Sequence, residues 1–239
     1  MKVLLDKEKL LVSDVVANNR MNRGRGCLGQ NSYRKDLSFD PIDFLKKRLS
    51  AGASVSWLDI CCGEGRALIE AAKVLTDFEQ TKKHRPELRI TGIDLAGMFG
   101  DHPVELNCLK LLEMPIEDFT PRGRFDLITC VHGLHYIGDK LSVIRKAAGW
   151  LKETGVFLAN FEVKSLKLVG KENSGRRFAG FLKAQGFALD QRKRLLSLQG
   201  TRTFELPFEY VAADDQAGPN YTGQPAVDSY YQEHGAKIK

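Results

Sequence analysis

Short apolar runs alternate with segments of helical periodicity through the middle of the chain. The apolar runs predict strands and lie at residues 55–60, 88–94, 106–112, 127–131 and 156–161. Between them, apolar residues recur every three or four positions at 67–75 and 140–151, as on the buried face of a helix. Alternating strands and helices predict the α/β class, with a doubly wound and mostly parallel sheet.

The residues before this region predict helices and one irregular segment. A helix is expected at about residues 7–16, and turn-forming residues then predict a basic, mobile flap at 18–29. Asp40 followed by Pro41 is typical of a helix start, because Asp caps the N-terminus and proline is tolerated in the first turn. That helix ends an N-terminal unit, which we place at residues 1–50.

The residues after the alternating region predict a helix, two further strands and a tail. Apolar spacing indicates the helix at residues 175–185 and the strands at 187–198 and 203–211. Gly, Pro, Asn and Asp are frequent at 212–239, which predicts a tail of coil that is at least partly disordered. We therefore expect a core domain at residues 51–211, followed by this tail.

Bulk composition fits a globular protein with one main domain. The chain has 239 residues, 43% hydrophobic and 28% charged, and no apolar run is long enough to span a bilayer. Charged residues interrupt the first positions, so we expect no secretory signal and predict a cytoplasmic protein. The five cysteines are odd in number and lack zinc-ligand spacing, so we expect reduced thiols and no metal site.

The net charge of +6 leaves the nature of the partner open. Basic residues cluster at 20–35 and at 164–194, without the interleaved aromatic residues of a platform for single-stranded nucleic acid. The clusters predict either a solvated basic face or a site for an anionic substrate. Such a substrate would be a small acid, a phosphate or a nucleic acid.

The end of the first strand carries the strongest functional signal. Residues 57–66 read WLDICCGEGR, a strand end followed by a tight turn and a helix start. Gly63 and Gly65 allow positive φ and a close approach by a ligand, and the helix N-terminus presents unpaired N–H groups. Asp59 would repel a pyrophosphate but attract a cation, and the third glycine of the dinucleotide fingerprint is absent. We therefore expect a cationic ligand at this turn.

The turn resembles motif I of the class I S-adenosylmethionine-dependent methyltransferases, whose usual form is D-x-G-x-G-x-G. Asp59, Gly63 and Gly65 match that motif, and Cys61 stands in place of its first glycine. S-adenosylmethionine carries an ammonium and a sulfonium group, in agreement with the charge of Asp59. The resemblance covers about residues 31–211. It implies the Rossmann-like methyltransferase fold, in which an antiparallel pair of strands completes a seven-stranded sheet and N-terminal helices form a lid.

Asp94 and the residues after it resemble motif II of the same family. The second strand also ends in an acid, and the carboxylate of Asp94 can accept two hydrogen bonds from a ribose diol. Leu95 follows at the hydrophobic step that flanks the adenosine in the family. The resemblance therefore implies that both residues bind the cofactor.

The segment after the third strand matches the family less well. Family members usually hold the adenine there with an aspartate and a backbone N–H, but Pro115 stands where the aspartate belongs. Glu113 or Glu117 would then substitute for the aspartate, or the backbone of Ile116 would hold the adenine. The sequence leaves these alternatives open.

Residues 125–139, which read FDLITCVHGLHYIGD, resemble motif IV. The resemblance places Val131 and His132 beside the methionine moiety and the methyl group. Because imidazole titrates near neutrality, His132 is the first candidate for a general base and His135 the second, and either histidine would otherwise be structural. Tyr33 lies where many small-molecule members have a lid residue, and it is a third catalytic candidate.

The resemblance implies transfer of a methyl group from S-adenosylmethionine to an oxygen, nitrogen or carbon nucleophile of a small, possibly anionic molecule. Alignment of the reactants and exclusion of water would be the main contributions of the protein. Two alternatives stay open: an RNA or DNA methyltransferase, and a non-catalytic S-adenosylmethionine-binding protein. The fourth strand lacks the N/D-P-P-Y box of enzymes that methylate amino groups of bases, which argues against the first. No membrane partner is expected, and the acceptor and the oligomeric state stay open.

Overall fold

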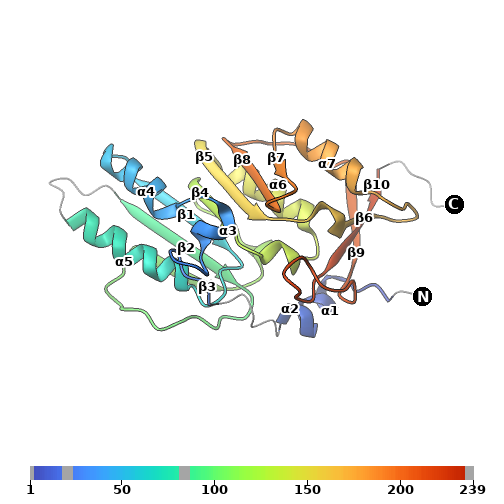
Figure 1. Cartoon of the computed structure of the whole chain (residues 1–239), viewed down its shortest axis with the longest axis horizontal. Helices are drawn as coiled ribbons and strands as arrows, with labels where there is room; N and C mark the ends of the chain where they lie inside the picture. The colour runs from blue at the N-terminus through green and yellow to red at the C-terminus, as the bar shows by residue number, and fades with distance from the viewer. Residues whose placement is uncertain (1–2, 18–23, 81–86, 235–239) are drawn as a thin grey trace.

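The computed structural model describes residues 3–17, 24–80 and 87–234, and a seven-stranded sheet lies at its centre (Figure 1). The strands are β1 (Val55–Ile60), β2 (Leu88–Asp94), β3 (Leu109–Glu113), β4 (Phe125–Cys130), β5 (Leu151–Asn160), β7 (Ala188–Asp190) and β8 (Leu195–Gln199). Their order is β3-β2-β1-β4-β5-β8-β7. β8 pairs antiparallel with both β5 and β7, and the other neighbouring strands pair parallel. The predicted doubly wound, mostly parallel, seven-stranded sheet is confirmed.

Helices cover both faces of this sheet. They are α4 (Pro41–Ser50), α5 (Arg66–Gln80), α6 (Lys140–Trp150) and α7 (Gly175–Ala184). Successive side chains of β1 point to opposite faces of the sheet and enter different cores. Trp57 belongs to the core with α4 and α5, and Leu58 to the core with α6 and α7. Because both faces are buried, every residue of β1 and β4 is buried, which explains their nearly continuous apolar runs.

The carboxyl ends of the parallel strands gather the polar residues of the sheet at one edge. Asp94 ends β2, and His132 lies just beyond β4. Two short 3₁₀ turns follow strands at this edge: η1 (Ile116–Asp118) after β3, and η2 (Gly133–His135) after β4. Open α/β sheets bind ligands at this edge, so the fold brings the motif residues to one place.

A second, three-stranded sheet lies beside the first. Its strands are β6 (Leu166–Leu168), β9 (Phe208–Asp214) and β10 (Asp228–Glu233), in the order β6-β10-β9. The strand predicted at 203–211 was expected to complete the central sheet, and that expectation is wrong, because β9 belongs to the second sheet. The antiparallel pair of the central sheet comes instead from β7 and β8.

The prediction of coil for the tail at 212–239 is wrong for β10. This strand pairs parallel with β6 and antiparallel with β9. Tyr231 is fully buried and packs against the rings of Phe178 and Tyr210. Long-range packing therefore orders a segment whose composition favours coil, while residues 235–239 lie outside the described residues.

The expected helix at 7–16 is two helices, α1 (Lys7–Leu11) and α2 (Asp14–Ala17), separated by Val12 and Ser13. Both lie beside β9 (Figure 1), where Leu5 and Ala213 exchange backbone hydrogen bonds of 2.7 and 2.9 Å. A further helix, α3 (Tyr33–Leu37), precedes α4. In the described part of the chain, no helix combines the length and apolar character needed to cross a membrane.

The predicted flap at 18–29 is only partly described, since residues 18–23 lie outside the described residues. The remainder runs along α5, where the Cys27 N–H donates to Glu70 Oε2 at 2.7 Å. The division of the chain into residues 1–50, 51–211 and 212–239 stays a prediction, and β9 and β10 pair across its last boundary.

Candidate active site

The turn between β1 and α5 is shaped by residues in the left-handed region. Cys61, Gly63 and Gly65 have φ of 57°, 61° and 70°. A Cβ on Gly65 would come within 2.9 Å of the side chain of Leu111, so this position requires glycine for both its φ and its space. The glycines that matched the sequence motif therefore have a structural reason for their place.

Asp94 joins the tip of β2 to this turn. Its Oδ2 accepts a hydrogen bond from the Gly63 N–H at 2.9 Å, and its Oδ1 accepts from the Ala96 N–H at 3.1 Å. Two backbone N–H groups thus hold the carboxylate at the rim of the turn, one from the turn itself and one from the segment after β2. That position leaves it facing the cavity described next.

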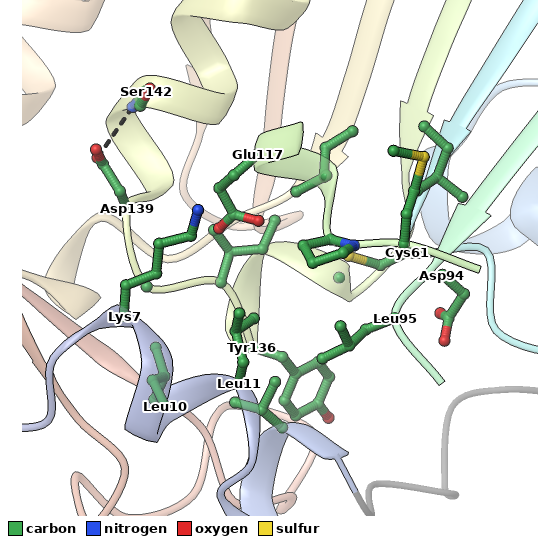
Figure 2. Close-up of a pocket in the computed structure, with 18 of the residues that line it drawn as sticks. Lys7, Leu10, Leu11, Cys61, Asp94, Leu95, Glu117, Tyr136, Asp139 and Ser142 are labelled. Atoms are coloured by element: carbon green, nitrogen blue, oxygen red, sulfur yellow. Dashed lines mark hydrogen bonds between the residues drawn. The ribbon is translucent and has the colours of Figure 1, made fainter. Parts of the chain in front are cut away.

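A cavity of about 390 Å³ opens at the carboxyl edge of the sheet (Figure 2). Its volume lies within the range of small-molecule and cofactor sites. Eight of the predicted site residues line it: Cys61, Gly63, Asp94, Leu95, Ile116, Glu117, Val131 and His132. Figure 2 shows Cys61, Asp94 and Leu95 at one end, and Lys7, Leu10 and Asp139 at the other. The turn, the tip of β2 and the segments after β3 and β4 thus share one cavity with α1.

The cavity lining narrows the alternatives for the segment after β3. Ile116 and Glu117 line the cavity, and Glu113 is not among its lining residues. Lys146 on α6 donates through Nζ to the backbone oxygen of Glu117 at 2.5 Å, which fixes the short turn η1. The neighbouring walls are apolar and come from Leu95, Met114, Pro115 and Ile116. This part of the cavity suits a flat, largely apolar ring with a polar edge.

Asp59 lies behind the turn and does not line the cavity. Its carboxylate is fully buried and accepts hydrogen bonds from Tyr33 Oη at 2.6 Å and Thr129 Oγ1 at 2.5 Å. Burial raises the pKa of Asp59 to about 7, although both hydrogen bonds act in the opposite direction. A direct contact between Asp59 and a cationic ligand stays a prediction, with no contact to the cavity to support it.

Tyr33 differs from its expected place as a lid residue. Its ring is buried, with the Trp57 ring in edge-to-face contact at a centroid distance of 6.4 Å, and its hydroxyl is used by Asp59. Apolar packing draws the ring under the turn, and the lid over the cavity comes instead from α1 and α2, through Lys7, Leu10, Leu11 and Val16. The catalytic role suggested for Tyr33 stays untested, and Gly65 likewise does not line the cavity.

His132 occupies a strained position just beyond β4. Its φ is 60°, in a region that non-glycine residues rarely adopt, and only 2% of its surface is exposed. The backbone N–H of His132 donates to Asn160 Oδ1 at 3.3 Å. Such strain persists where the surrounding structure fixes it, and it is concentrated at functional sites. His132 therefore remains the leading candidate base on geometric grounds.

His135 is as buried as His132, but it is absent from the cavity lining. Burial lowers its pKa to about 3, and His132 and two nearby lysines contribute in the same direction. The ring is therefore neutral at neutral pH, and its backbone oxygen accepts from the Val227 N–H at 2.9 Å. These contacts fit a packing role, and the suggested role as second base has no contact with the cavity to support it.

Sequence reasoning missed the part of the site that comes from the two ends of the chain. Lys7 from α1 and Tyr210 from β9 line the cavity, and so does Asp139, the residue that caps α6. Tyr221 lies beside His132, with its hydroxyl 3.3 Å from Nδ1. The one signal for this part of the site in the sequence is the presence of tyrosines in the tail.

A family described as a methyltransferase domain matches residues 31–202, more than half of the chain. The chain belongs to this methyltransferase family. The match confirms the family identified from the motifs around Asp59, Asp94 and His132. It also supports S-adenosylmethionine as the cofactor. No curated protein matches the chain.

Several solved methyltransferases resemble the chain in structure at low identity. Magnesium protoporphyrin IX methyltransferase (ChlM) from Synechocystis PCC 6803, with bound SAM, has 16% identity over 82% of this chain and 98% of its own, with a TM-score of 0.46. The plantazolicin methyltransferase BpumL in complex with SAH has 17% identity over 56% of this chain and 50% of its own, with a TM-score of 0.37. An S-adenosylmethionine-dependent methyltransferase from Clostridium acetobutylicum ATCC 824 has 23% identity over 54% of this chain and 52% of its own, with a TM-score of 0.33. The chain spans about half the length of the plantazolicin methyltransferase structures.

Proposed function

We propose that the protein transfers a methyl group from S-adenosylmethionine to an oxygen, nitrogen or carbon nucleophile of a small molecule. The observation that supports this most directly is the cavity at the carboxyl edge of the sheet. Its lining combines the turn after β1, the carboxylate of Asp94, the segment after β3 and the side chain of His132. These are the positions that the motifs assigned to the two ends of one cofactor and to its methyl group.

The cavity residues fit the cofactor part by part. The carboxylate of Asp94 would accept hydrogen bonds from the ribose diol. Leu95 and Ile116 would pack on the adenine, and Glu117 would accept from its amino group. Gly63, which lacks a Cβ, would let the methionine portion approach the backbone. When bound, the cofactor supplies an activated methyl group on a sulfonium sulfur, and the protein's task is to align an acceptor with it and to exclude water.

Calorimetric titration with S-adenosylhomocysteine tests the proposed cofactor site. The Asp94→Ala variant should bind it roughly tenfold to a hundredfold more weakly than the wild type, because a hydrogen-bonded charged partner is lost. Glu113→Ala is the matched control, since Glu113 ends the neighbouring strand β3 and does not line the cavity. Its affinity should equal that of the wild type.

Asp94 also accepts from the Gly63 N–H, so a thermal unfolding scan of each variant must accompany the titration. Equal affinity in a folded Asp94→Ala variant would remove Asp94 from the site. Binding of NAD in place of S-adenosylhomocysteine would overturn the proposed cofactor. Formation of S-adenosylhomocysteine during incubation with candidate acceptors would separate an enzyme from a protein that only binds the cofactor.

A further inference from the structure

Two side chains from distant parts of the chain meet at His132. Asp36 comes from the last turn of α3, and Tyr221 from the segment between β9 and β10. His132 Nε2 lies 3.4 Å from Asp36 Oδ2, and His132 Nδ1 lies 3.3 Å from Tyr221 Oη. A neutral imidazole has one N–H donor and one acceptor nitrogen. The tyrosine contact therefore fits an Nδ1 that accepts from Tyr221 Oη. The remaining Nε2–H then lies near the carboxylate, at ion-pair distance but without a hydrogen bond to it.

Asp36 is held in place by two contacts besides His132. Arg25 Nη1 lies 2.9 Å from Asp36 Oδ2, and Asn160 Nδ2 donates to the backbone oxygen of Asp36 at 3.2 Å. Asn160 also accepts from the backbone N–H of His132, so one side chain ties α3 to the segment after β4. The relative position of the carboxylate and the imidazole is thus set by Asn160 at the end of β5, a strand of the seven-stranded sheet.

Tyr221 is anchored at both its backbone and its ring. Its N–H donates to Glu162 Oε2 at 3.1 Å, and the Arg194 guanidinium lies 5.9 Å from the centre of its ring. The His135 ring packs against it at a centroid distance of 5.5 Å. The residue is nevertheless 38% exposed, whereas only 2% of His132 is exposed. Tyr221 is not among the lining residues of the cavity, whereas His132 is, so an acceptor that reaches Tyr221 approaches His132 from the exposed side of the cluster.

The charged groups around the cluster come from every element packed against it. Asp36 and Arg25 lie on one side of His132, Glu162 and Arg194 flank Tyr221, and the neutral ring of His135 packs at 6.1 Å from that of His132. Burial, together with Asp36 and Glu162, raises the pKa of Tyr221. The hydroxyl is therefore protonated at neutral pH and can donate to Nδ1.

We propose that Asp36, His132 and Tyr221 form a proton relay for the methyl acceptor. Tyr221 contacts the acceptor, His132 receives the proton, and Asp36 is a positioning residue that holds the imidazole and stabilises its charged form. The inference rests on the proposed methyl transfer and extends it to the chemical class of the acceptor, which carries an O–H or N–H group at its nucleophilic atom. A nucleophile without a proton would need no such relay.

The step balances with the groups present in the cluster and the two substrates. The nucleophilic atom bonds to the methyl carbon while the carbon–sulfur bond breaks, and the electron pair of that bond stays on sulfur. The acceptor's proton passes to Tyr221 Oη as the hydroxyl proton of Tyr221 moves to His132 Nδ1. Tyr221 is thereby restored, and His132 becomes an imidazolium beside the Asp36 carboxylate.

NMR of protein labelled with ¹⁵N in the histidine rings tests the cluster without any acceptor. Signals that vanish in His132→Gln assign the ring, and the neutral wild-type ring should be the Nε2–H form by roughly tenfold, the effect of one hydrogen bond. Tyr221→Phe should change the Nδ1 signal, and Asp36→Asn should reduce the excess of the Nε2–H form. Tyr230→Phe and Asp101→Asn, which change residues outside the cluster, should leave both signals in place.

An Nδ1–H form in the wild type, or no response to Tyr221→Phe in a folded protein, would overturn the relay. Calorimetry with S-adenosylhomocysteine on the same samples separates this failure from that of the proposed function. Wild-type binding without the NMR pattern sinks the relay alone, whereas absent binding sinks both. With an acceptor in hand, Tyr221→Phe should lower kcat by about a hundredfold or more with cofactor affinity unchanged. Full activity of Tyr221→Phe would contradict the inference.

Discussion

Asp59 shows how the environment of a residue sets what its chemistry can do. The motif identified it as a carboxylate at a strand end, and the strand end is where it lies. Its depth is set by Tyr33, from α3, and Thr129, from β4, which both donate to it. Because these partners are distant in sequence, no local pattern predicts that the carboxylate is fully buried. Strand register and side-chain packing decide that.

The buried carboxylate of Asp59 should make the stability of the protein fall as the pH rises from about 4 to 7. Its folded pKa of about 7 lies above the ordinary value of 3.8, so the folded state binds the extra proton in this window. Each pKa unit corresponds to about 1.4 kcal/mol, so the free energy of unfolding should be lower above pH 7 than below pH 4 by at most roughly 4 kcal/mol. Asp59→Asn removes the charge and should flatten this decline.

Urea unfolding of wild type and Asp59→Asn at several pH values measures the effect. Asp101→Asn, which changes an exposed carboxylate, is the control and should keep the wild-type pH dependence. If Asp59→Asn shows the same decline between pH 4 and 7 as the wild type, the carboxylate is ionised throughout that range and its burial has been compensated by its hydrogen bonds.

The turn between β1 and α5 is an element that the sequence predicted well, because its chemistry is local. Gly63 and Gly65 are needed for backbone angles that other residues rarely adopt, and such a need is visible in any sequence. The position of Leu111 against Gly65 was not visible, since it depends on β3 reaching the turn from across the sheet. The positive φ at Gly65 is therefore a local reason for glycine, and the contact with Leu111 is a tertiary one.

Gly65→Ala and Gly52→Ala separate these two reasons. Both glycines have left-handed φ, 70° and 78°, so each substitution should cost about 1–2 kcal/mol from the backbone alone. A Cβ at Gly52 meets nothing within 4 Å, whereas one at Gly65 lies 2.9 Å from Leu111. Gly65→Ala should therefore destabilise the protein by an additional 1–3 kcal/mol, roughly the cost of overpacking.

Denaturant unfolding of both variants gives the difference directly. The same pair in a Leu111→Ala background should show a smaller difference, because the clash has been removed while the backbone cost remains. Equal costs for the two glycines in the wild-type background would mean that the Leu111 side chain moves aside freely. The packing argument for Gly65 would then be wrong.

β10 is the element that the sequence did not predict, and its contacts give the reason. Lys140 on α6 is fully buried and donates through Nζ, at 2.8 Å each, to the backbone oxygens of Ile137 and Val227 and to Ser229 Oγ. Tyr231 Oη accepts from the Leu141 N–H at 3.0 Å. Val227, Ser229 and Tyr231 lie about ninety residues from Lys140 and Leu141 along the chain. Tail composition alone gives no sign of them, so coil was the expected state.

At the scale of the whole molecule, the sequence predicted the layers and the first five strands, because both faces of that sheet are buried and its strands stand out as apolar runs. It did not predict that the two chain ends meet. Leu5 pairs with Ala213, and together α1 and β9 supply one wall of the cavity through Leu10 and Tyr210. That wall depends on contacts between segments with no shared local pattern.

The distribution of charge bears on the open question of nucleic acid. Five of the nine basic residues at 164–194 form ion pairs within the chain. Lys164 and Arg194 lie 3.2 and 3.5 Å from Glu162. Lys171 and Arg177 lie 2.6 and 2.9 Å from Glu233, in β10. A basic run in the sequence is thus matched by acids that folding brings to it, and this reduces the positive field that phosphates would meet.

We therefore predict weak binding of nucleic acid, despite the net charge of +6. A twenty-nucleotide RNA or DNA should bind more weakly than about 10⁻⁴ M at physiological salt, the weak end of non-specific affinities. Fluorescence anisotropy at several salt concentrations measures both the affinity and its salt dependence. Glu233→Gln frees Lys171 and Arg177 and should strengthen binding at low salt. Glu113→Gln changes a residue of β3, an edge strand of the seven-stranded sheet, and should not strengthen it. Micromolar binding by the wild type, with a slope steeper than about −5 in log Kobs against log salt, would mean six or more phosphate contacts and would favour a nucleic-acid methyltransferase over an enzyme for small molecules.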